Sequence, residues 1–430
     1  MTALRPIRAE APVVLAAAAL AAATTALGIA LRSGGTAIGV PIPPFILDWS
    51  PAAEPLWAIA AALALAGAVA AAPRLLAWPA RPWVFATLLV ALALVLHVVV
   101  GTVRHGPDGL DAVLDPGGSR EGKNEYLPAL RALSYGPGFL LDHFSELVPS
   151  LPVHAAGHPP GLLLTMHWLG IDTPAQLAAL CIGAGALTVP LGYALARTLL
   201  ESEHKARVAA LLLLMSPAVI DFGATSADAV YATLGVAAAL LLVRWPLLGA
   251  AALAVASFYA WSLLAVGAWA VLLAWRREGL VQAARVAAAC SVAVLGFYAG
   301  LAAATGYDPV GTFHSTEQVY RLGIASMRPY AYWLFGSPVA WGVAAGIPIA
   351  AWWLRAVVSG RPAAIALAAV VAAAAVGGFT KAETERIWLF LVPFACIAAA
   401  EVLPRRRLVP VLAFLAVQTA VCEVLFESAW

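Results

Sequence analysis

Apolar runs of about 20 residues constrain this chain more than any other feature, because a helix needs that length to cross a bilayer. Such runs recur along most of its 430 residues. The composition agrees: 63% of the residues are hydrophobic and 11% are charged, with a mean hydropathy of +0.89. A soluble globular protein carries about 25% charged residues. We therefore predict an all-α, polytopic transmembrane helical bundle, since a β-barrel would show short alternating segments instead.

Hydropathy predicts about thirteen spans. Their approximate limits are 11–31, 54–72, 82–102, 174–199, 206–222, 226–244, 246–258, 260–275, 280–303, 333–355, 362–379, 387–403 and 408–425. The seventh and eighth are short, and we interpret them as half-spans or as one bent hairpin. The first run is longer than the apolar region of a signal peptide, so we expect it to be a retained span.

The distribution of charge predicts the orientation. A cytoplasmic N-terminus places 16 of the 25 Lys and Arg residues on the cytoplasmic side and 18 of the 23 Asp and Glu residues outside. Basic residues concentrate in cytoplasmic loops, which favours this arrangement. We therefore expect a multi-pass plasma-membrane protein in which the long loop at about 103–173 is extracytoplasmic.

Short helices are predicted inside this long loop. The stretch "SREGKNEYLPALRALSYG", residues 119–136, is rich in charge but continues as an amphipathic segment. The stretch "HPPGLLLTMHWLG" begins with two prolines, which suit a helix start, and is too short to cross a bilayer. We expect juxtamembrane helices lying at the interface.

In this topology, polar residues near the outer ends of the spans meet at one face of the membrane. They are Asn124, Glu125, Tyr126, His154, His158, Asp221, Asp228, His314, Arg321, Arg328, Lys381, Glu383, Glu385 and Arg386. Charges near membrane depth are costly and usually mark function. A carboxylate there could accept a proton, and the cations could hold an anionic group such as a phosphate.

Four motifs follow one another on the predicted outer face: "NEYLPAL" at 124–130, "GHPPGLLL" at 157–164, "TSADAVYATLGVAAALLL" at 225–242 and "ETERIWLFLVPF" at 383–394. In their order, spacing and sidedness, the chain resembles the GT-C superfamily of integral-membrane glycosyltransferases, which use polyprenyl-phosphate-linked sugars. The first position of the family's acidic pair is Asn124 here. The resemblance implies a core at 82–403 with its catalytic loop at about 103–173. Residues 1–81 would add two N-terminal spans, and 404–430 would hold a C-terminal span.

The resemblance further implies transfer of a sugar, with inversion, from a polyprenyl phosphate to an extracytoplasmic glycan, glycolipid or protein. Mannose or arabinose would suit an actinobacterium, which the scarcity of Lys and the high Ala, Arg and Val content suggest. Glu125 is the first choice for the catalytic base, Asp228 the second, and Asp142 or Glu146 the third. The residues expected to bind substrate are Asn124, Tyr126, His158, Arg321, Arg328, Lys381, Glu385 and Arg386.

Structural alternatives remain open for several of these residues. Asn124 and Asp228 could cap helices, and Arg386 could be an interfacial anchor. We find no Gly-rich phosphate loop, HExxH or CxxC motif, so no cofactor is assigned, although a divalent cation is compatible with the carboxylates. Membrane lipid, but no nucleic acid, is an expected partner. The alternative function is a transporter or flippase of a lipid-linked envelope precursor, which would place polar or broken helices at the midplane.

Overall fold

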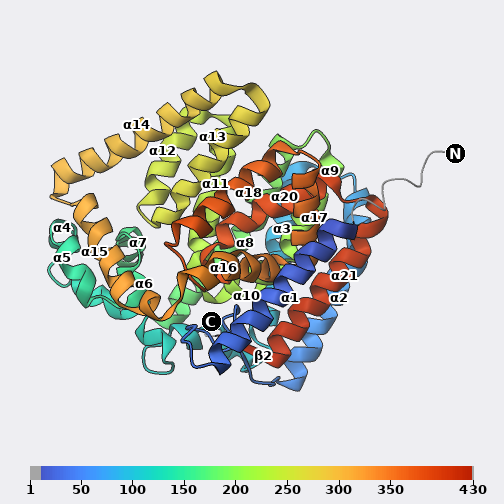
Figure 1. The fold of residues 1–430 in the computed structure, drawn as a ribbon, viewed down its shortest axis with the longest axis horizontal. Helices are drawn as coiled ribbons and strands as arrows, with labels where there is room; N and C mark the ends of the chain where they lie inside the picture. Colours follow the sequence, from blue (N-terminus) through green and yellow to red (C-terminus); the bar gives the residue numbers. More distant parts are fainter. Residues whose placement is uncertain (1–10, 429–430) are drawn as a thin grey trace.

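The computed structural model describes residues 11–428 and is almost entirely helical, as predicted (Figure 1). Within these residues, six helices are long and apolar enough to cross a membrane, and up to eight spans result if each of two bent pairs counts as one. The six are α1 (Ala11–Ser33), α2 (Pro55–Ala77), α3 (Pro82–Gly101), α8 (Pro174–Leu199), α14 (Leu280–Thr305) and α21 (Leu408–Leu425), the last with the turn before it. The chain is thus a membrane-embedded helical bundle with six to eight candidate spans.

The two bent pairs break segments that the sequence predicted as single spans. Helix α9 (Glu203–Leu214) meets α10 (Pro217–Thr225) at 57°, and α16 (Tyr330–Ala345) meets α17 (Ile347–Val358) at 114°. The second bend turns at Gly346, whose φ of 120° suits glycine, and the following helix begins with a proline at its first turn. The prediction of one continuous span over 333–355 is therefore wrong.

Shorter helices fill the bundle. They are α11 (Asp228–Arg244), α12 (Pro246–Ser257), α13 (Leu264–Glu278), α18 (Pro362–Gly377) and α20 (Val392–Val402). Between α12 and α13 the chain forms a short 3-10 turn, so the predicted half-spans are two separate helices. Helix α8 packs against α3, α9 and α11; its buried residues include three alanines and two glycines, and alanine is the commonest buried residue in α20. Small side chains let the helices approach closely.

The predicted outer loop is folded into short helices, as expected. They are η2 (Gly106–Leu110), η3 (Ala112–Leu114), η4 (Glu121–Lys123), η5 (Leu127–Leu133), α4 (Pro137–Asp142), α5 (Phe144–Leu147), η6 (Val148–Ser150), α6 (Val153–Ala156) and α7 (Gly161–Leu169). Helix α15 (Pro309–Leu322) packs against α5 and η6. Its first turn is capped by Asp308, which accepts a hydrogen bond from the Gly311 amide at 2.8 Å.

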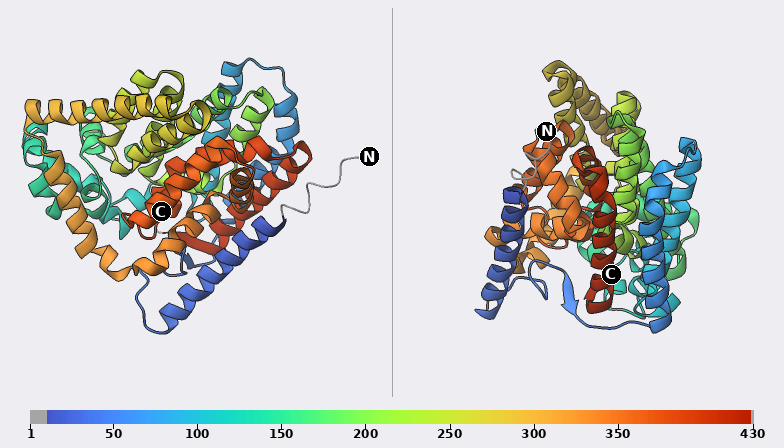
Figure 2. Two further views of the ribbon diagram at one scale, coloured as in Figure 1. Left: turned by 45° about the horizontal axis from the view of Figure 1, so that its top comes forward. Right: turned by 90° about the vertical axis from the view of Figure 1, so that its right-hand side faces the viewer.

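Helices α1 and α2 are joined by a connection of about 20 residues and pack against different parts of the bundle. Helix α1 lies beside α16 and α17, whereas α2 packs against α3 and α21 (Figure 2). Between them, β1 (Leu47–Trp49) pairs antiparallel with β2 (Phe426–Ser428), a small sheet that the sequence analysis did not predict. The connection therefore ties the beginning of the chain to its end.

Candidate functional site

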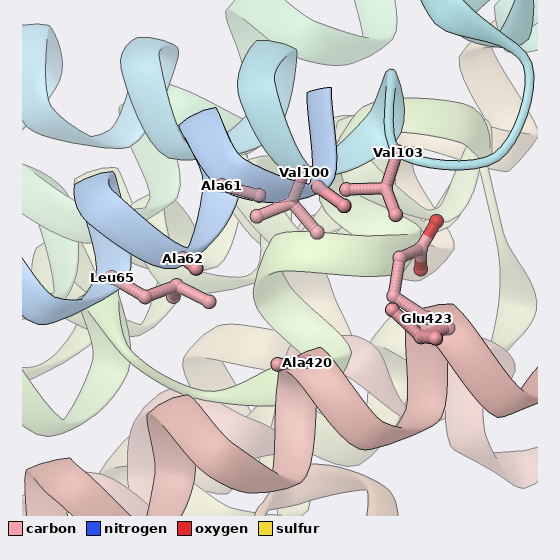
Figure 3. A pocket seen from close by; sticks show the side chains of 9 residues that line it. Ala61, Ala62, Leu65, Val100, Val103, Ala420 and Glu423 are labelled. Atoms are coloured by element: carbon pink, nitrogen blue, oxygen red, sulfur yellow. The ribbon is translucent and has the colours of Figure 1, made fainter. Parts of the chain in front are cut away.

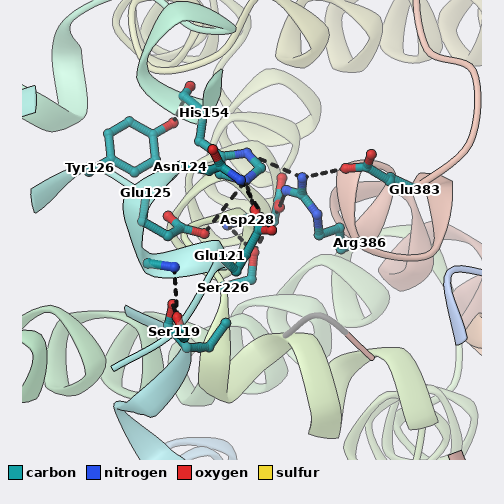
Figure 4. Close-up of polar contacts among 12 residues, drawn as sticks. Ser119, Glu121, Asn124, Glu125, Tyr126, His154, Ser226, Asp228, Glu383 and Arg386 are labelled. Atoms are coloured by element: carbon teal, nitrogen blue, oxygen red, sulfur yellow. Dashed lines mark hydrogen bonds and ion pairs between the residues drawn. The ribbon is translucent and has the colours of Figure 1, made fainter. Parts of the chain in front are cut away.

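Arg386 is the centre of a buried cluster of charges (Figure 4). It belongs to the one-turn helix α19 (Thr384–Ile387) and is 4% exposed. Its Nη1 donates to Asp228 Oδ2 at 2.6 Å, and its Nη2 donates to Glu383 Oε2 at 2.7 Å. Burial alone would lower the pKa of Arg386, but the charges of Asp228 and Glu383 raise it. Arg386 therefore forms a buried, hydrogen-bonded ion pair with the start of α11, a pairing that the sequence did not predict.

Glu383 joins this arginine to a second one. Its other oxygen accepts a hydrogen bond from Arg328 Nη2, and Arg328 Nη1 donates to the carbonyl of Lys381 at 2.6 Å. Burial would raise the pKa of Glu383, but the charges of Arg386 and Arg328 outweigh it and lower the pKa to about 2. Both Ala382 and Glu383 have left-handed backbones, with φ of 64° and 58°. Such strain costs about 1–3 kcal/mol per residue and often marks ligand-binding loops.

His154 links the arginine to the outer loop. Its Nδ1 lies 3.3 Å from Arg386 Nη2, and its Nε2 lies 2.6 Å from Glu121 Oε1 and 3.9 Å from Glu125 Oε1. Burial would raise the pKa of Glu121, but hydrogen bonding to His154 lowers it. Glu121 and Glu125 are therefore drawn into the cluster, whereas the basic residues of the charged stretch remain exposed.

Glu125 and Tyr126 are both buried, at 2% exposure. The Tyr126 hydroxyl contacts the Tyr231 hydroxyl of α11 at 2.5 Å and donates to the carbonyl of His154 at 3.2 Å. Burial raises the pKa of Tyr126, so its hydroxyl stays protonated. The His158 ring packs against Tyr231, with 4.9 Å between ring centroids, and loss of solvation lowers the pKa of His158 to about 4. His158 can therefore orient a ligand by a hydrogen bond, but not by a positive charge at neutral pH.

The geometry separates the candidates for the base. Asp228 Oδ2 accepts hydrogen bonds from both Arg386 and Ser226, which makes it a poor proton acceptor. Asp142 and Glu146 are exposed on α4 and α5, outside the buried cluster. Glu125 remains the first choice for the base, and Asp228 is better suited to hold Arg386.

The capping interpretations do not describe these residues. Asn124 lies at the C-terminal end of η4, and its side-chain amide donates to Glu121 at 3.4 Å, while Tyr126 occupies the cap position of the next helix. Asp228 is the first residue of α11, and its carboxylate bonds to Ser226 and Arg386.

Three predicted binding residues lie at the edge of the cluster. Lys381 Nζ donates to the carbonyl of Ala325 at 2.8 Å, which occupies one of its donors. Arg321 is exposed and pairs with Glu317 on its own helix. Glu385 is 3% exposed and accepts a hydrogen bond from the Ile46 amide at 2.9 Å; burial raises its pKa to about 7.

Sequence reasoning assigned no binding or catalytic role to several residues that complete the cluster. They are Glu121, His154, Ser226, Tyr231 and Glu383. Proximity to the motifs was the only available signal: Glu121 lies three residues before Asn124, and Glu383 three before Arg386. His154 lies three residues before the second motif, but its contacts with residues 33 and 232 positions away could not be predicted from the sequence.

The donor set of Glu121, Glu125 and His154 could hold a divalent cation. One ligand atom from each lies within 4.8 Å of the others. Carboxylate and imidazole ligands suit several divalent metals. Among the described residues of the cluster, four carboxylates, including those of Asp228 and Glu383, face two guanidinium groups, so additional positive charge would be favourable there.

A separate small cavity lies between α2, α3 and α21 (Figure 3). Its volume of about 20 Å³ is enough for one water molecule. Glu423 is the one acidic residue among the apolar side chains that line it. None of the site residues described above contributes to this lining, so the cavity is distinct from the charged cluster.

No protein-family model matches this chain, and neither the curated proteins nor the solved structures include a match to it. The functional interpretation therefore depends on the four motifs and on the geometry of the charged cluster.

Proposed function

We propose that the protein transfers a sugar from a polyprenyl-phosphate donor to an acceptor hydroxyl outside the cytoplasm. One observation carries this proposal. Motifs spread over more than 250 residues of the chain contribute Glu125, Asp228 and Arg386 to a single buried cluster at helix ends. Burying charges costs free energy even when they are paired, and charged residues near membrane depth usually mark function.

In the proposed reaction, Glu125 accepts the proton of the acceptor hydroxyl as the hydroxyl oxygen attacks the anomeric carbon of the sugar. The bond between that carbon and the phosphate oxygen breaks, and polyprenyl phosphate leaves with the bonding electrons. One displacement inverts the anomeric centre. Arg386 and Arg328 stabilise the negative charge that develops on the leaving phosphate. Asp228 and Glu383 hold the two guanidinium groups in place.

A divalent cation is a second element of the proposal. Glu121 and His154 would hold it beside Glu125, and it would supply positive charge near the leaving phosphate. If this is correct, transfer should be lost on chelation with EDTA and restored by adding Mg²⁺ or Mn²⁺. Glu121→Gln should raise the cation concentration that is needed for half-maximal transfer.

Transport of a lipid-linked precursor is the second candidate function. The 114° break between α16 and α17 favours it, because transporters often bind substrates at interrupted helices. The charged cluster distinguishes the two functions, since transport requires no proton acceptor beside the arginines.

The decisive experiment uses purified protein in liposomes with a polyprenyl-phosphate-linked mannose or arabinose and a glycan acceptor. Glu125→Gln keeps the size and hydrogen bonding of the side chain but cannot accept a proton. We expect turnover to fall by roughly 10²-fold or more, with donor binding nearly intact. Asp228→Asn is the matched variant. We expect it to lower turnover and also to weaken donor binding, because Asp228 holds Arg386. Lipid movement across the bilayer without sugar transfer would instead establish the transporter.

A further inference from the structure

Residues 34–54 connect α1 to α2. The part from 38 to 54 packs against the loop that carries the arginine cluster, and we name this part the strap. Ile38 and Val40 of the strap are buried, at 2% and 8% exposure, in a cluster with Tyr332, Trp333 and Ala382. Trp333 Nε1 also donates to the carbonyl of Ile38 at 3.2 Å. The strap thus covers the residue that begins the strained turn at Ala382 and Glu383.

Two strap residues contact the charged cluster itself. A Cβ atom at Gly39 would lie 2.9 Å from Cγ and 3.1 Å from Nε of Arg328, so the absence of a side chain lets the strap lie directly on that arginine. The φ of Gly39 is 79°, which also favours glycine. Seven residues later, the Ile46 amide donates to Glu385 at 2.9 Å.

The far end of the strap is anchored to the rest of the bundle. Arg104 Nη2 donates to the carbonyl of Ser50 at 2.7 Å, and the Glu54 amide donates to the carbonyl of Val103 at 2.7 Å. Strand β1 adds its pairing with β2. A segment fixed at both ends can hold what lies beneath it, whereas a loose loop could not.

We propose that the strap is a positioning element of the anion-binding site, in which Gly39 fixes Arg328 and Ile46 fixes the 381–386 loop. Held in this way, Arg328 and Arg386 share the carboxylate of Glu383, and the left-handed backbone at Ala382 and Glu383 is maintained. A strained turn persists only where its surroundings enforce it. The identity of the anion, a polyprenyl phosphate, rests on the proposed function. The contacts of the strap with Arg328 and Glu385 do not depend on it.

A pair of glycines provides the test. Gly39→Ala places a methyl group against Arg328. Gly35→Ala is the matched control, because Gly35 has a similar φ of 86° but no described atom lies within 4 Å of its Cβ position. We expect Gly39→Ala to raise the donor KM by about 10-fold or more with a smaller effect on kcat, since small displacements of binding groups are costly. Gly35→Ala should leave both nearly unchanged.

Amide hydrogen exchange of residues 383–388 provides a readout that does not depend on transfer. It should accelerate in Gly39→Ala but not in Gly35→Ala. If no preparation transfers sugar, the proposed function fails, yet this measurement still tests the strap. Equal exchange and equal kinetics in the two variants would overturn the positioning role while leaving the transferase intact.

A double variant covers the case in which Gly39→Ala does not fold. Truncation of Arg328 to alanine removes the atoms that the new methyl group would meet. Combining Gly39→Ala with Arg328→Ala should therefore restore folding and add little to the exchange rate of Arg328→Ala alone. Failure of the double variant to fold, where Arg328→Ala alone does fold, would show that the defect lies elsewhere in the strap.

Discussion

Arg207 and Arg386 are almost equally buried, at 5% and 4% exposure, but most partners of Arg207 are backbone carbonyls whereas those of Arg386 are side chains. Arg207 donates to the carbonyls of Leu75, Trp78 and Ala80, and its Nε donates to Glu203 at 2.8 Å. Arg386 bonds instead to the side chains of Asp228 and Glu383 and lies beside that of His154.

A buried arginine in a helical bundle can hold either backbone or ligand-binding side chains. Backbone carbonyls at the end of α2 are fixed acceptors, so Arg207 joins that end to α9 and satisfies groups that the helix leaves free. The partners of Arg386 can change protonation, rotate or exchange a bond for one to a ligand. Burial alone therefore does not distinguish a structural arginine from a functional one, whereas the type of partner does.

If Arg386 binds an extracytoplasmic substrate and Arg207 is structural, the two arginines lie on opposite sides of the membrane. Helix α8, 26 residues long and about 39 Å by helical rise, runs from the loop side to Arg197, which pairs with Glu203. We expect an impermeant maleimide to label Lys123→Cys on intact cells and to label Ser359→Cys only after permeabilisation. The native cysteines are buried or partly buried and should give little background. The reverse pattern would place the charged cluster in the cytoplasm and exclude the proposed donor reaction.

Replacement of Arg386 should then produce the largest loss of transfer per folded molecule. Arg386→Ala removes a hydrogen-bonding cation that stabilises the negative charge developing on the leaving phosphate. We therefore expect transfer to fall by about 10²–10³-fold. Arg386→Lys should recover only part of it, because lysine keeps the charge but loses the planar fork. The measurements are kcat and donor KM, corrected for the folded fraction. Normal donor affinity in Arg386→Ala would assign this residue the same structural role as Arg207.

Arg207→Ala should show the opposite balance. It leaves several carbonyl acceptors unsatisfied, each at a cost of about 1–3 kcal/mol, so the free energy of unfolding should fall by about 3 kcal/mol or more. Transfer by the molecules that remain folded should change by less than about twofold, because the Arg207 side chain binds mainly backbone carbonyls and lies outside the proposed site. Thermal unfolding in detergent and kcat are the two measurements. A loss of transfer comparable to that of Arg386→Ala would remove the distinction between the two arginines.

The sequence predicted the long helices more accurately than the sharp bends between helices. The spans expected at 82–102, 174–199 and 280–303 match α3, α8 and α14 within two residues at either end, because hydropathy measures the length of an apolar run directly. The sharp bend at Gly346 was missed because apolar composition continues through it and glycine there leaves hydropathy unchanged. The pairing of β1 with β2 was missed because three-residue strands at opposite ends of the chain leave no periodic pattern.

The candidate site was predictable as a group of residues but not as a network. Motif order brought Glu125, Asp228 and Arg386 into one hypothesis, and the structure places them in one cluster. The bridging role of Glu383 depends on a left-handed backbone, which no sequence pattern indicates for a glutamate. The partnership of His154 with Glu121 depends on how the outer loop folds back, which is a tertiary property.

Glu385 is intermediate between the two arginines in the type of group that it contacts. It precedes Arg386 in the chain, yet it bonds to a backbone group, the Ile46 amide, as Arg207 does. Because burial raises its pKa from 4.5 to about 7, the folded protein holds a proton that the unfolded chain has released between these values. The stability contributed by this proton is complete below about pH 4.5 and is lost as the pH rises through about 7.

Glutamine at position 385 keeps an oxygen for the Ile46 amide but cannot titrate. The difference in Tm between the native protein and Glu385→Gln should therefore shift against the native protein as the pH rises from 5 to 8, by a few degrees at most. Taking the difference removes the contribution of other groups that titrate in this range. Transfer at pH 7 should change less than in Arg386→Lys, because the carboxyl of Glu385 is engaged with the strap. Parallel Tm curves across this pH range would mean that Glu385 is already ionised at pH 5. The Glu385 carboxyl would then not be buried in its contact with the Ile46 amide.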